Sequence, residues 1–576
     1  MSTRVALVNP PNRITGEYFP IGLGIIAAVL KNEGHDVFII DDGIECSTTE
    51  RLVERVVKTN PDIIGITGLV TYYGYIKHLS GKLNDRIPNV PIMVGGPITS
   101  AVGDLLLEKT RADIVVIGEG ERTVVQICEK VHDNDLSSVC GIWYRDKSSG
   151  VIVKNPPQDR ISDLDTVPMP QYDMFAMDKY VHTHSSIIRS FNPTASMNVI
   201  SSRGCPYQCT FCSKAFGRKV SYRSVVSILD EVRYLKKEYG VDFFLFNDEL
   251  FTILDERITE FCERLLEQSM DIHWAAWARP QRLRGKTLEL MKRSGCRFLS
   301  LGVESGSQRN LDDVKKKTNV EEIIDTVFAI ENSGIRVHAN YMIGYPNDDL
   351  ESIRDTLRLR ISINNTSLPY YTFLTPLPGT VLFDSIKAKN GLDTMDKQEQ
   401  YIEKFANTNL HFGDVLAINI TNWDDTTLLK HAETIKKDQD AFFQLMETQG
   451  VFGERLLLKI LEVINECSLK RKSLRTDSLK TALGKVNEII GYFKENYGLA
   501  LKAYKDHIEP RDDLAFEQLN TEYGVLGENA NVSLLSTIDS APEFREMVEA
   551  LSKRIPELAR LVSQYEIRVA SAREYV

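Results

Sequence analysis

Short apolar runs alternate with longer amphipathic stretches through the first 131 residues of the chain. The runs are rich in Val and Ile, which favours buried strands, and the stretches between them carry apolar residues at helical spacing. The pattern predicts strands at 4–8, 37–40, 62–67, 91–94 and 113–117, and helices at 20–32, 49–59, 73–84, 99–109 and 121–131. Such alternation is typical of an open, doubly wound parallel sheet, here assigned to residues 1–135.

The pattern changes between residues 136 and 190. Two β-rich segments, 142–144 and 151–153, lie on either side of Lys147-Ser148-Ser149-Gly150 and predict a β-hairpin. Several prolines between residues 156 and 170 then predict an extended linker. We therefore expect residues 136–190 to connect two larger folding units.

The alternation of strands and helices resumes at residue 191 with longer helices. One of these helices, 225–238, carries Ile228, Val232 and Leu235 on a single face. Strands are predicted at 196–201, 242–247, 271–278, 297–303, 336–342 and 370–375. Six such units predict a partial (βα)6 barrel of TIM type at residues 191–415, with its chemistry at the carboxyl ends of the strands.

The last part of the chain, residues 416–576, shows helical periodicity and no further strand pattern. Apolar residues recur at three- and four-residue spacing from Leu479 to Phe493 and again from Phe544 to Val562. We expect an all-helical C-terminal domain behind the two α/β units. Stripes of this kind usually pack in a core, so they carry no functional signal of their own.

Charge and cysteine usage narrow the class of protein. The formal net charge of -11 gives a nucleic-acid partner no electrostatic support. The apolar stretch at 21–30 is too short to cross a bilayer, and no signal peptide is expected at Met1, so no membrane association is predicted. Nine cysteines, an odd number and mostly isolated, argue against a disulfide framework and favour the reducing cytoplasm.

Cys205, Cys209 and Cys212 follow the first predicted barrel strand with C-x3-C-x2-C spacing. Soft thiolate ligands favour zinc or an iron–sulfur cluster. Three ligands leave one coordination position open, whereas structural zinc is normally closed by four. The spacing alone leaves two other interpretations open, namely a zinc site completed by a distant histidine and three ordinary buried cysteines.

Polar or small residues follow the strands of both α/β units, at the edge where ligands bind. In the barrel they are 247–249, Arg279, 304–307, 344–348 and 376–380, and in the first sheet they are 9–11, 41–43, 67–71, 95–97 and 118–121. Residues 22–27 also fit the dinucleotide fingerprint G-x-G-x-x-A. That fingerprint requires glycines directly after the first strand, and the loop 9–19 intervenes, so NAD binding is disfavoured.

The cysteine motif, with Phe211 before its last cysteine, resembles the signature of the radical S-adenosylmethionine (SAM) enzymes. Residues 302–307 are similar to the SAM motif on the fourth strand of that group, and residues 376–380 to its sixth-strand motif. The first 135 residues resemble the cobalamin-binding domain fused to one large subgroup, through 9–11, 19–23, 95–97 and 118–121. The resemblance covers about residues 1–415, and the cysteine motif is its most specific part.

The resemblance implies that Cys205, Cys209 and Cys212 hold a [4Fe–4S] cluster whose fourth iron binds SAM. One electron from the cluster cleaves SAM and produces a 5′-deoxyadenosyl radical, which abstracts a hydrogen atom from the substrate. Asp248 or Glu249 is expected to contact the SAM amino group, and this pair departs from the family's common Gly-Gly-Glu motif. The full set of expected SAM residues is Phe211, Asp248, Glu249, Arg279, Glu304, Ser305 and Gly344.

The resemblance also implies cobalamin at the edge of the first sheet. The expected contacts are Asn9, Pro10, Gly22, Asp42, Thr67, Thr71, Gly95, Gly96, Gly118, Glu119 and Gly120. Many corrinoid proteins bind cobalt through a histidine in the loop after the first strand, but the loop 9–19 contains neither Asp nor His. Cobalamin is therefore expected base-off, without a protein histidine ligand, a state suited to accepting a methyl group.

These features lead to the hypothesis of a cobalamin-dependent methyltransferase that acts at an unactivated carbon of a small biosynthetic intermediate. A cyclase or rearrangement enzyme of the same subgroup is the first alternative, and a non-enzymatic corrinoid- or zinc-binding regulator is the second. An external electron donor such as flavodoxin or ferredoxin is implied, and the C-terminal region is expected to cover the substrate. Tyr341 and Tyr370 are the catalytic candidates, with Trp277 and Tyr371 as further possible substrate contacts.

Overall fold

The structure is a computed structural model of the full chain, which divides into two compact units, Met1–Leu429 and Lys430–Val576. It describes residues 2–11, 18–133, 135–184, 186–189, 191–281, 283, 285–363, 370–404, 416 and 418–432. Almost all of the predicted helical domain at 416–576 lies outside the described residues. None of the described helices is long and apolar enough to cross a membrane.

The N-terminal sheet has seven strands in the order β2-β1-β3-β4-β5-β6-β7. The first five strands are parallel, as predicted, and the expected hairpin adds β6 and β7 to the same sheet as antiparallel strands. The strands are β1 Arg4–Asn9, β2 Asp36–Asp41, β3 Ile63–Thr67, β4 Ile92–Gly95, β5 Ile114–Val116, β6 Ile142–Arg145 and β7 Ile152–Lys154. The strand order reverses at β1 and β3, where doubly wound sheets bind their ligands.

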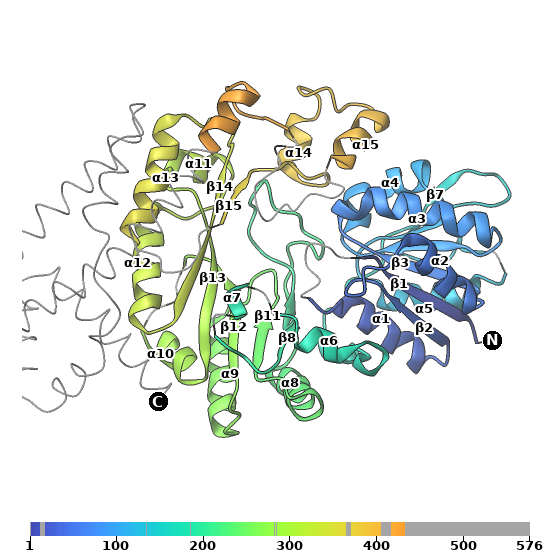
Figure 1. Cartoon of the computed structure of the whole chain (residues 1–576), viewed down its shortest axis with the longest axis horizontal. Helices are drawn as coiled ribbons and strands as arrows, with labels where there is room; N and C mark the ends of the chain where they lie inside the picture. Colours follow the sequence, from blue (N-terminus) through green and yellow to red (C-terminus); the bar gives the residue numbers. More distant parts are fainter. Residues whose placement is uncertain are drawn as a thin grey trace, which may run out of the picture. The chain divides into compact units, whose positions relative to one another are not determined.

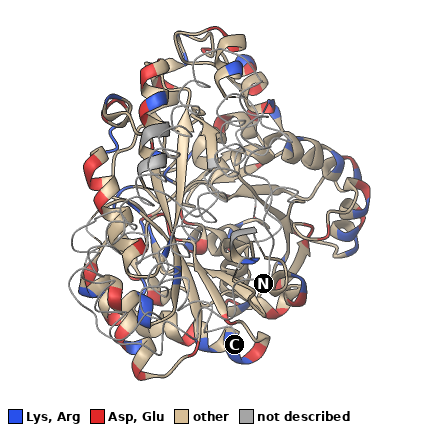
Figure 2. Cartoon of the chain, turned by 60° about the vertical axis from the view of Figure 1, so that its left-hand side comes forward, with Lys and Arg blue, Asp and Glu red and all other residues tan. Residues whose placement is uncertain are grey.

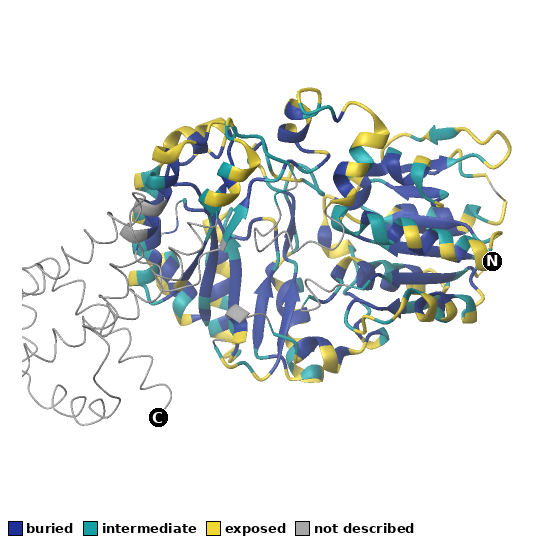
Figure 3. Ribbon diagram, turned by 45° about the horizontal axis from the view of Figure 1, so that its top comes forward, coloured by how far each residue is buried: buried dark blue, intermediate teal, exposed yellow. Residues whose placement is uncertain are grey.

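Helices cover both faces of this sheet. One core cluster joins α1 and α5 to one face, and a second cluster joins α2, α3 and α4 to the other. The helices are α1 Ile21–Asn32, α2 Thr49–Lys58, α3 Tyr73–Arg86, α4 Ile98–Lys109 and α5 Glu121–Lys130, with the short turn η1 at Val70–Tyr72. Figure 3 shows buried strands between helices whose outer faces are exposed.

The second sheet is the predicted partial barrel. Its six parallel strands lie in the order β15-β14-β13-β12-β11-β8, so the first and last strands in sequence are its two edges. The strands are β8 Ser196–Val199, β11 Phe243–Phe246, β12 His273–Ala278, β13 Cys296–Glu304, β14 Arg336–Ile343 and β15 Tyr370–Phe373. A short antiparallel pair, β9 Ser202–Arg203 and β10 Ser221–Tyr222, follows β8.

The barrel helices lie outside the strands (Figure 1). They are α8 Val225–Tyr239, α9 Asp255–Glu267, α10 Lys286–Arg293, α11 Gln308–Asp313, α12 Val320–Asn332 and α13 Leu350–Ser362. The linker forms η2 Leu164–Thr166, η3 Tyr172–Met174, α6 Met177–Val181 and α7 Ser186–Arg189, and α14 Val381–Ile386 and α15 Met395–Glu403 follow the barrel. Acidic and basic side chains are mixed along the outer helices (Figure 2).

The pleat of the barrel strands separates two sets of side chains. Phe243, Leu245, Ala275 and Phe298 form a small cluster inside the barrel, together with the partly buried Phe191. The alternate residues of the same strands belong to the large cluster that contains the barrel helices. The strand register therefore decides which side chains can face a substrate in the barrel.

The segment 376–404 returns from the barrel to the N-terminal sheet. Helix α15 packs on α3, where Glu399 accepts hydrogen bonds from the Tyr73 hydroxyl (2.7 Å) and from Lys77 (2.8 Å). On the other side of the sheet, Asn198 of β8 holds the backbone of Phe19 through two hydrogen bonds. The two sheets are thus joined by contacts from distant parts of the sequence.

Candidate functional site

The cysteine loop begins directly after β9 and is closed at its base by the β9–β10 pair. Gly204 has a φ of +95°, and a Cβ atom at this position would lie 2.4 Å from the Lys219 carbonyl oxygen. Only glycine fits such a conformation and approach. The backbone N–H of Cys205 then donates to the Gly217 carbonyl oxygen at 3.2 Å, so the loop folds back on itself at its first cysteine.

The three cysteines differ in their surroundings. Cys209 is buried, Cys205 is half-buried and Cys212 is exposed. Cys209 and Cys212 line a cavity of about 130 Å³ together with Ser100 and Ala101 of α4. In the described part of the chain, no three His, Cys, Asp or Glu side chains are placed to share one metal ion. A [4Fe–4S] cluster does not need such convergence, because each cysteine binds a different iron atom.

Arg279, at the end of β12, lies against the second cysteine. Its Nη1 is 3.5 Å from Cys209 Sγ, and its guanidinium carbon is 3.8 Å from the centre of the Tyr207 ring. The residue is 6% exposed, yet its Nε and Nη2 have no hydrogen-bond partner among the described residues. A buried cation with two free donors fits an anionic ligand beside Cys209.

The two acids after β11 have different environments. Asp248 is buried, and its oxygens accept hydrogen bonds from Ser201 N (2.6 Å), Ser201 Oγ (2.5 Å) and Ser202 Oγ (2.7 Å). Burial raises the pKa of Asp248, an effect that these hydrogen bonds oppose. Glu249 is exposed and lies near enough to Cys205 and Cys212 to add a small part to the raised pKa of both thiols, of which desolvation by the surrounding protein is the main cause. Asp248 therefore braces β8, and Glu249 is the acid near the cysteines.

Glu304 ends β13 in a strained conformation, with a φ of +70° that is rare for a residue with a side chain. It is buried and forms an ion pair with Lys316 at 2.6 Å. A Cβ atom on Gly302 would lie 2.3 Å from Glu304 Oε1, so the glycine makes room for this pair. Sequence reasoning missed Lys316, because nothing in the run of lysines at 315–317 distinguishes the one that is buried.

The other predicted SAM residues mainly support loops. The Ser305 hydroxyl lies 3.0 Å from Thr356 Oγ1 and accepts from Ser307 N at 3.1 Å. The backbone N–H of Gly344 donates to Asp348 at 2.7 Å, and Gly344 has a φ of +88°. Phe211 is partly buried against the cluster that also contains α3 and α4. Their assignment to SAM stays a prediction.

The strand register places Tyr341 of β14 and Tyr371 of β15 away from the barrel interior. Tyr341 is fully buried in the cluster that contains the barrel helices and stacks on Tyr371, with ring centres 5.1 Å apart. Burial raises the pKa of Tyr341 well above its usual value. Tyr370 pairs in register with Asn340 of β14. Trp277 of β12 donates a hydrogen bond to Asn247 Oδ1 at 2.8 Å. Its side chain lies on the opposite face of the strand from Trp274, which packs against the barrel helices.

Glycines line the edge of the N-terminal sheet that is formed by the carboxyl ends of its parallel strands. Gly22 at the second position of α1, Gly95 at the end of β4 and Gly118 after β5 have no atom within 4 Å of an added Cβ. Thr67 ends β3 and Thr71 lies in η1, and both are partly exposed. Open glycines beside partly exposed hydroxyls fit a large, flat ligand that must approach the backbone closely, as a corrinoid does.

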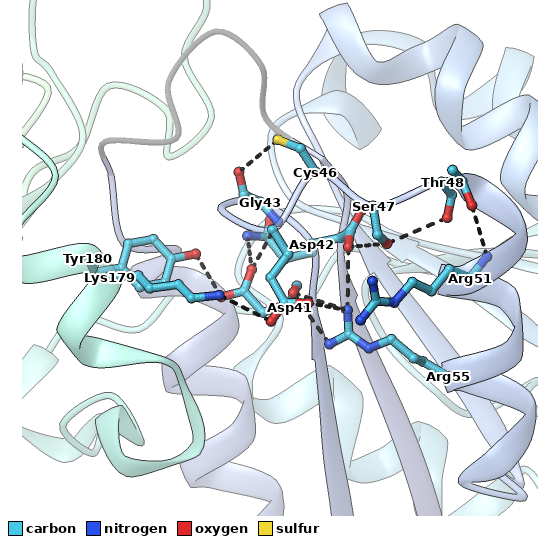
Figure 4. A network of polar contacts seen from close by, with 12 residues as sticks. Asp41, Asp42, Gly43, Cys46, Ser47, Thr48, Arg51, Arg55, Lys179 and Tyr180 are labelled. Atoms are coloured by element: carbon cyan, nitrogen blue, oxygen red, sulfur yellow. Dashed lines mark hydrogen bonds and ion pairs between the residues drawn. The ribbon is translucent and has the colours of Figure 1, made fainter.

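A polar network occupies the carboxyl ends of β1 and β2 (Figure 4). Asp41 accepts hydrogen bonds from Asn9 Nδ2 (2.8 Å) and from the Tyr180 hydroxyl of α6 (2.7 Å). Asp42 is fully buried and accepts from Ser47 Oγ at 2.6 Å, but its Oδ2 has no partner among the described residues. Asp42 thus retains one free carboxylate oxygen, whereas Asn9 is bound within the protein.

The remaining predicted cobalamin residues contact the protein itself. Pro10 is buried, and a Cβ on Gly96 would lie 2.8 Å from Thr67 Oγ1. A Cβ on Gly120 would lie 3.3 Å from Ile26 of α1. Both oxygens of Glu119 are engaged, because Oε1 binds Arg203 and Oε2 accepts from Ile161 N. Sequence reasoning did not assign Arg203 a role, since its partners lie 82 and 84 residues away.

Two known families match this chain, one in the region of the N-terminal sheet and the other in the region of the barrel sheet. Residues 12–128 match the model of the B12 binding domain, and residues 199–360 match the model of the radical SAM superfamily. The first match covers the glycine-lined edge, and the second covers the cysteine loop and the strands around it.

Two curated relatives span both regions. An uncharacterized methyltransferase of Pyrococcus horikoshii is 30% identical over 406 residues, which are 68% of this chain and 85% of the relative. The anaerobic magnesium-protoporphyrin IX monomethyl ester cyclase of Rubrivivax gelatinosus is 28% identical over 385 residues, which are 65% of this chain and 68% of the relative. The two relatives are therefore named for different kinds of reaction.

Among solved structures, the radical SAM methyltransferase TsrM of Kitasatospora setae, with cobalamin and a [4Fe–4S] cluster bound, has the same fold. The TM-score is 0.57 at 17% sequence identity, and the match covers 68% of this chain and 75% of the other. At this level of identity the likeness shows a shared fold.

Proposed function

This chain belongs to the cobalamin-dependent radical SAM enzymes, and on that premise we propose that it is a methyltransferase. It moves a methyl group from SAM, by way of cobalamin, to an unactivated carbon of a small biosynthetic intermediate. The family implies a [4Fe–4S] cluster, SAM and cobalamin as its cofactors. When bound, the cluster supplies an electron to SAM and cobalamin carries the methyl group.

One observation supports this proposal above the others. Ser100 and Ala101, which follow β4 of the N-terminal sheet, line the same cavity as Cys209 and Cys212 of the barrel. The ligand edge of the first sheet therefore faces the cysteine loop directly. Methyl transfer requires cobalamin and SAM to reach the same substrate, and a cavity shared by the two sheets supports a proposal that needs both cofactors close together.

The residues around Cys209 fit the polar end of SAM. We assign the SAM amino group to Glu249, because Asp248 is fully occupied by Ser201 and Ser202. The SAM carboxylate is assigned to Arg279, whose free Nε and Nη2 are already buried beside the cluster ligand. When SAM is bound, Glu249 and Arg279 would hold its amino and carboxylate groups beside the cysteine loop.

The proposed cobalamin cradle uses Gly22, Gly95 and Gly118, where backbone is exposed without a side chain. The free oxygen of Asp42 would accept a hydrogen bond from one of the side-chain amides of the corrinoid. No histidine is available in the loop 9–19 to bind the cobalt. Cobalt without a strong protein ligand accepts a methyl group readily, which favours methyl transfer.

Anaerobic reconstitution with iron, sulfide and cobalamin, followed by incubation with methyl-labelled SAM and a reductant, tests this function without knowledge of the substrate. A methyltransferase is expected to place label on cobalamin and to release S-adenosylhomocysteine. The Cys209→Ala variant should lose reductive SAM cleavage. A protein that binds four irons per chain and forms 5′-deoxyadenosine, but never S-adenosylhomocysteine, is not a methyltransferase.

The similarity to the magnesium-protoporphyrin cyclase supports a second candidate function. A cyclase of this family uses the same cluster and sheet without net methylation, so the residues around Cys209 have the same tasks. The labelling experiment separates the two, because a cyclase leaves the methyl group of SAM in methionine.

A further inference from the structure

Arg203, the residue before the cysteine loop, reaches from the barrel to the N-terminal sheet. Its Nη1 lies 2.8 Å from Glu119 Oε1 and its Nη2 lies 2.6 Å from Glu121 Oε1. All three side chains are at most 10% exposed. A guanidinium that bridges two carboxylates is held in a defined position and orientation, unlike an exposed ion pair between flexible side chains.

The two acids are themselves fixed by the turn between β5 and α5. Gly118, with a φ of +84°, turns the chain directly after the strand. Glu119 Oε2 accepts from Ile161 N at 2.7 Å, and Glu121 begins α5, where the helix dipole favours a negative charge. The turn therefore presents both carboxylates to the barrel as one rigid group.

The barrel side is equally constrained. Arg203 pairs with Ser221 in the β9–β10 pair, and its carbonyl oxygen accepts from Arg160 Nη2 at 2.8 Å. Gly204, which follows, has no space for a side chain. Cys205 comes next, so little of the chain between Arg203 and the first cluster ligand can adjust. A movement of Arg203 is passed to Cys205.

We propose that Arg203, with Glu119 and Glu121, couples cobalamin binding at the N-terminal sheet to the cluster loop of the barrel. The turn that holds the two acids starts at Gly118, one of the open glycines of the cobalamin edge, so a ligand there fixes the turn and, through Arg203, the loop. Arg203 is a positioning residue and touches neither cofactor. The proposal rests on the proposed function, because it requires both cofactors.

Coupling between two binding sites is reciprocal, so it appears as a change in cobalamin affinity when the cluster is present. We would measure the dissociation constant of hydroxocobalamin for the full-length protein anaerobically, with the cluster reconstituted and with the iron removed. The wild-type protein is expected to bind hydroxocobalamin at least about fivefold more tightly with the cluster. The ratio of the two dissociation constants, without and with the cluster, should fall to about one in Arg203→Met. In Arg203→Lys, which keeps one contact, the ratio should lie between the values of Arg203→Met and the wild-type protein.

Arg223→Met is the matched control. Arg223, directly after β10, forms a largely buried ion pair with Glu231, with 15% and 2% of the side chains exposed. Its side-chain partners among the described residues, Glu231, Ile200 and Ser227, all lie outside the N-terminal sheet. The control should lose stability but keep the affinity ratio. If Arg203→Met folds poorly, Glu121→Gln keeps the side-chain size and should lower the ratio.

Two outcomes overturn the proposal. A wild-type protein whose hydroxocobalamin affinity is the same with and without the cluster has no coupling to lose. An Arg203→Met or Glu121→Gln protein that keeps the wild-type ratio shows that the coupling runs elsewhere. Failure of the proposed function differs from both, because that protein would take up no cluster, bind no cobalamin, or form no S-adenosylhomocysteine.

Discussion

At the scale of single residues, burial distinguishes side chains that look equivalent in the sequence. Asp248 and Glu249 are adjacent acids after one strand, and the family motif did not decide between them. Asp248 accepts hydrogen bonds from Ser201 and Ser202, which follow the neighbouring strand β8. Glu249 is exposed near the cysteines. One acid supports the fold, and the other is available to a ligand.

We expect Glu249→Gln to weaken SAM binding by about 10- to 100-fold, because a charge-assisted hydrogen bond contributes about 1.5–3 kcal/mol. The cluster should form normally in this variant. SAM affinity and iron content of the reconstituted protein measure both properties. Asp248→Asn provides the contrast, since an amide cannot accept all three hydrogen bonds from Ser201 and Ser202. It should reduce the free energy of unfolding by about 1–3 kcal/mol, and SAM binding lost only in Asp248→Asn would reverse our assignment.

Glu331 of α12 leads to a prediction about pH. Burial raises the pKa of its carboxyl from 4.5 to about 8, and its Oε1 has no hydrogen-bond partner among the described residues. The folded protein therefore keeps a proton that the unfolded chain releases, so this residue costs stability as the pH rises from about 4.5 to about 8. Glu331→Gln should raise the free energy of unfolding at pH 7 by up to about 3 kcal/mol.

Urea unfolding between pH 5 and pH 8 measures this effect. The difference between Glu331→Gln and the wild-type protein should shrink as the pH falls toward 5, because the unfolded chain then gains much less free energy by releasing the proton of this glutamate. Glu321→Gln, at an exposed position in the first turn of the same helix, is the control and should show no such trend. A variant that is equally destabilised at every pH would contradict the prediction.

At the scale of elements, the pleat of a strand decides function more sharply than the residue type. Ser300 pairs with His338 and Gly302 with Asn340 across β13 and β14, on the parity that faces the barrel interior. Tyr341 directly follows Asn340, so it has the opposite parity and packs toward the helices. A tyrosine near the end of a barrel strand looked like a catalytic candidate, yet one step along the strand changes its surroundings completely.

Tyr341→Phe should therefore leave the rate of reductive SAM cleavage within about twofold of the wild-type value. The Tyr341 hydroxyl is buried without a partner among the described residues, so its removal should leave stability unchanged or raise it by up to about 1 kcal/mol. Tyr341→Ala should cost about 3–5 kcal/mol, because it leaves a cavity beside Tyr371. Chemical unfolding and 5′-deoxyadenosine formation measure these effects, and a large loss of cleavage in Tyr341→Phe would restore Tyr341 as a catalytic candidate.

The periodicity of the sequence was sufficient for the elements themselves. All predicted strands of both sheets are present, because each depends on a local alternation of apolar residues. The cysteine loop was equally visible, since its ligands lie within eight positions. Contacts such as Arg203 with Glu119, or Tyr73 with Glu399, could not be predicted from the sequence. Two charged or polar residues far apart in a sequence carry no sign that they touch.

At the scale of the whole described molecule, contacts from late in the sequence complete the surface of the first domain. Leu382, Phe383 and Tyr401 belong to the same core cluster as α3 and α4 of the N-terminal sheet. Glu399 supplies the acceptor for the Tyr73 hydroxyl, and Tyr73 is fully buried. The segment 376–404 is therefore part of the N-terminal domain in energetic terms, although the barrel separates them in the sequence.

We expect Glu399→Ala to reduce the free energy of unfolding by about 1–3 kcal/mol, because the buried Tyr73 hydroxyl loses its partner. Glu403→Ala is a closely matched control, since Glu403 lies on the same helix and its ion-pair partner in the described part of the chain is the partly exposed Lys77. Its cost should be about 0–1 kcal/mol. Parallel urea titrations of the two variants test the difference, and equal effects would mean that the contact with Tyr73 contributes nothing.

The contact between Tyr73 and Glu399 joins residues 326 positions apart. During synthesis on the ribosome, the barrel must therefore be translated before residues 376–404 can cover the surface of α3 and α4 in the first domain. A gene fragment that stops after the first sheet would encode a protein with an uncovered apolar surface on α3 and α4. The N-terminal domain therefore cannot be moved to another protein as residues 1–135 alone. A graft of this domain should include residues 376–404.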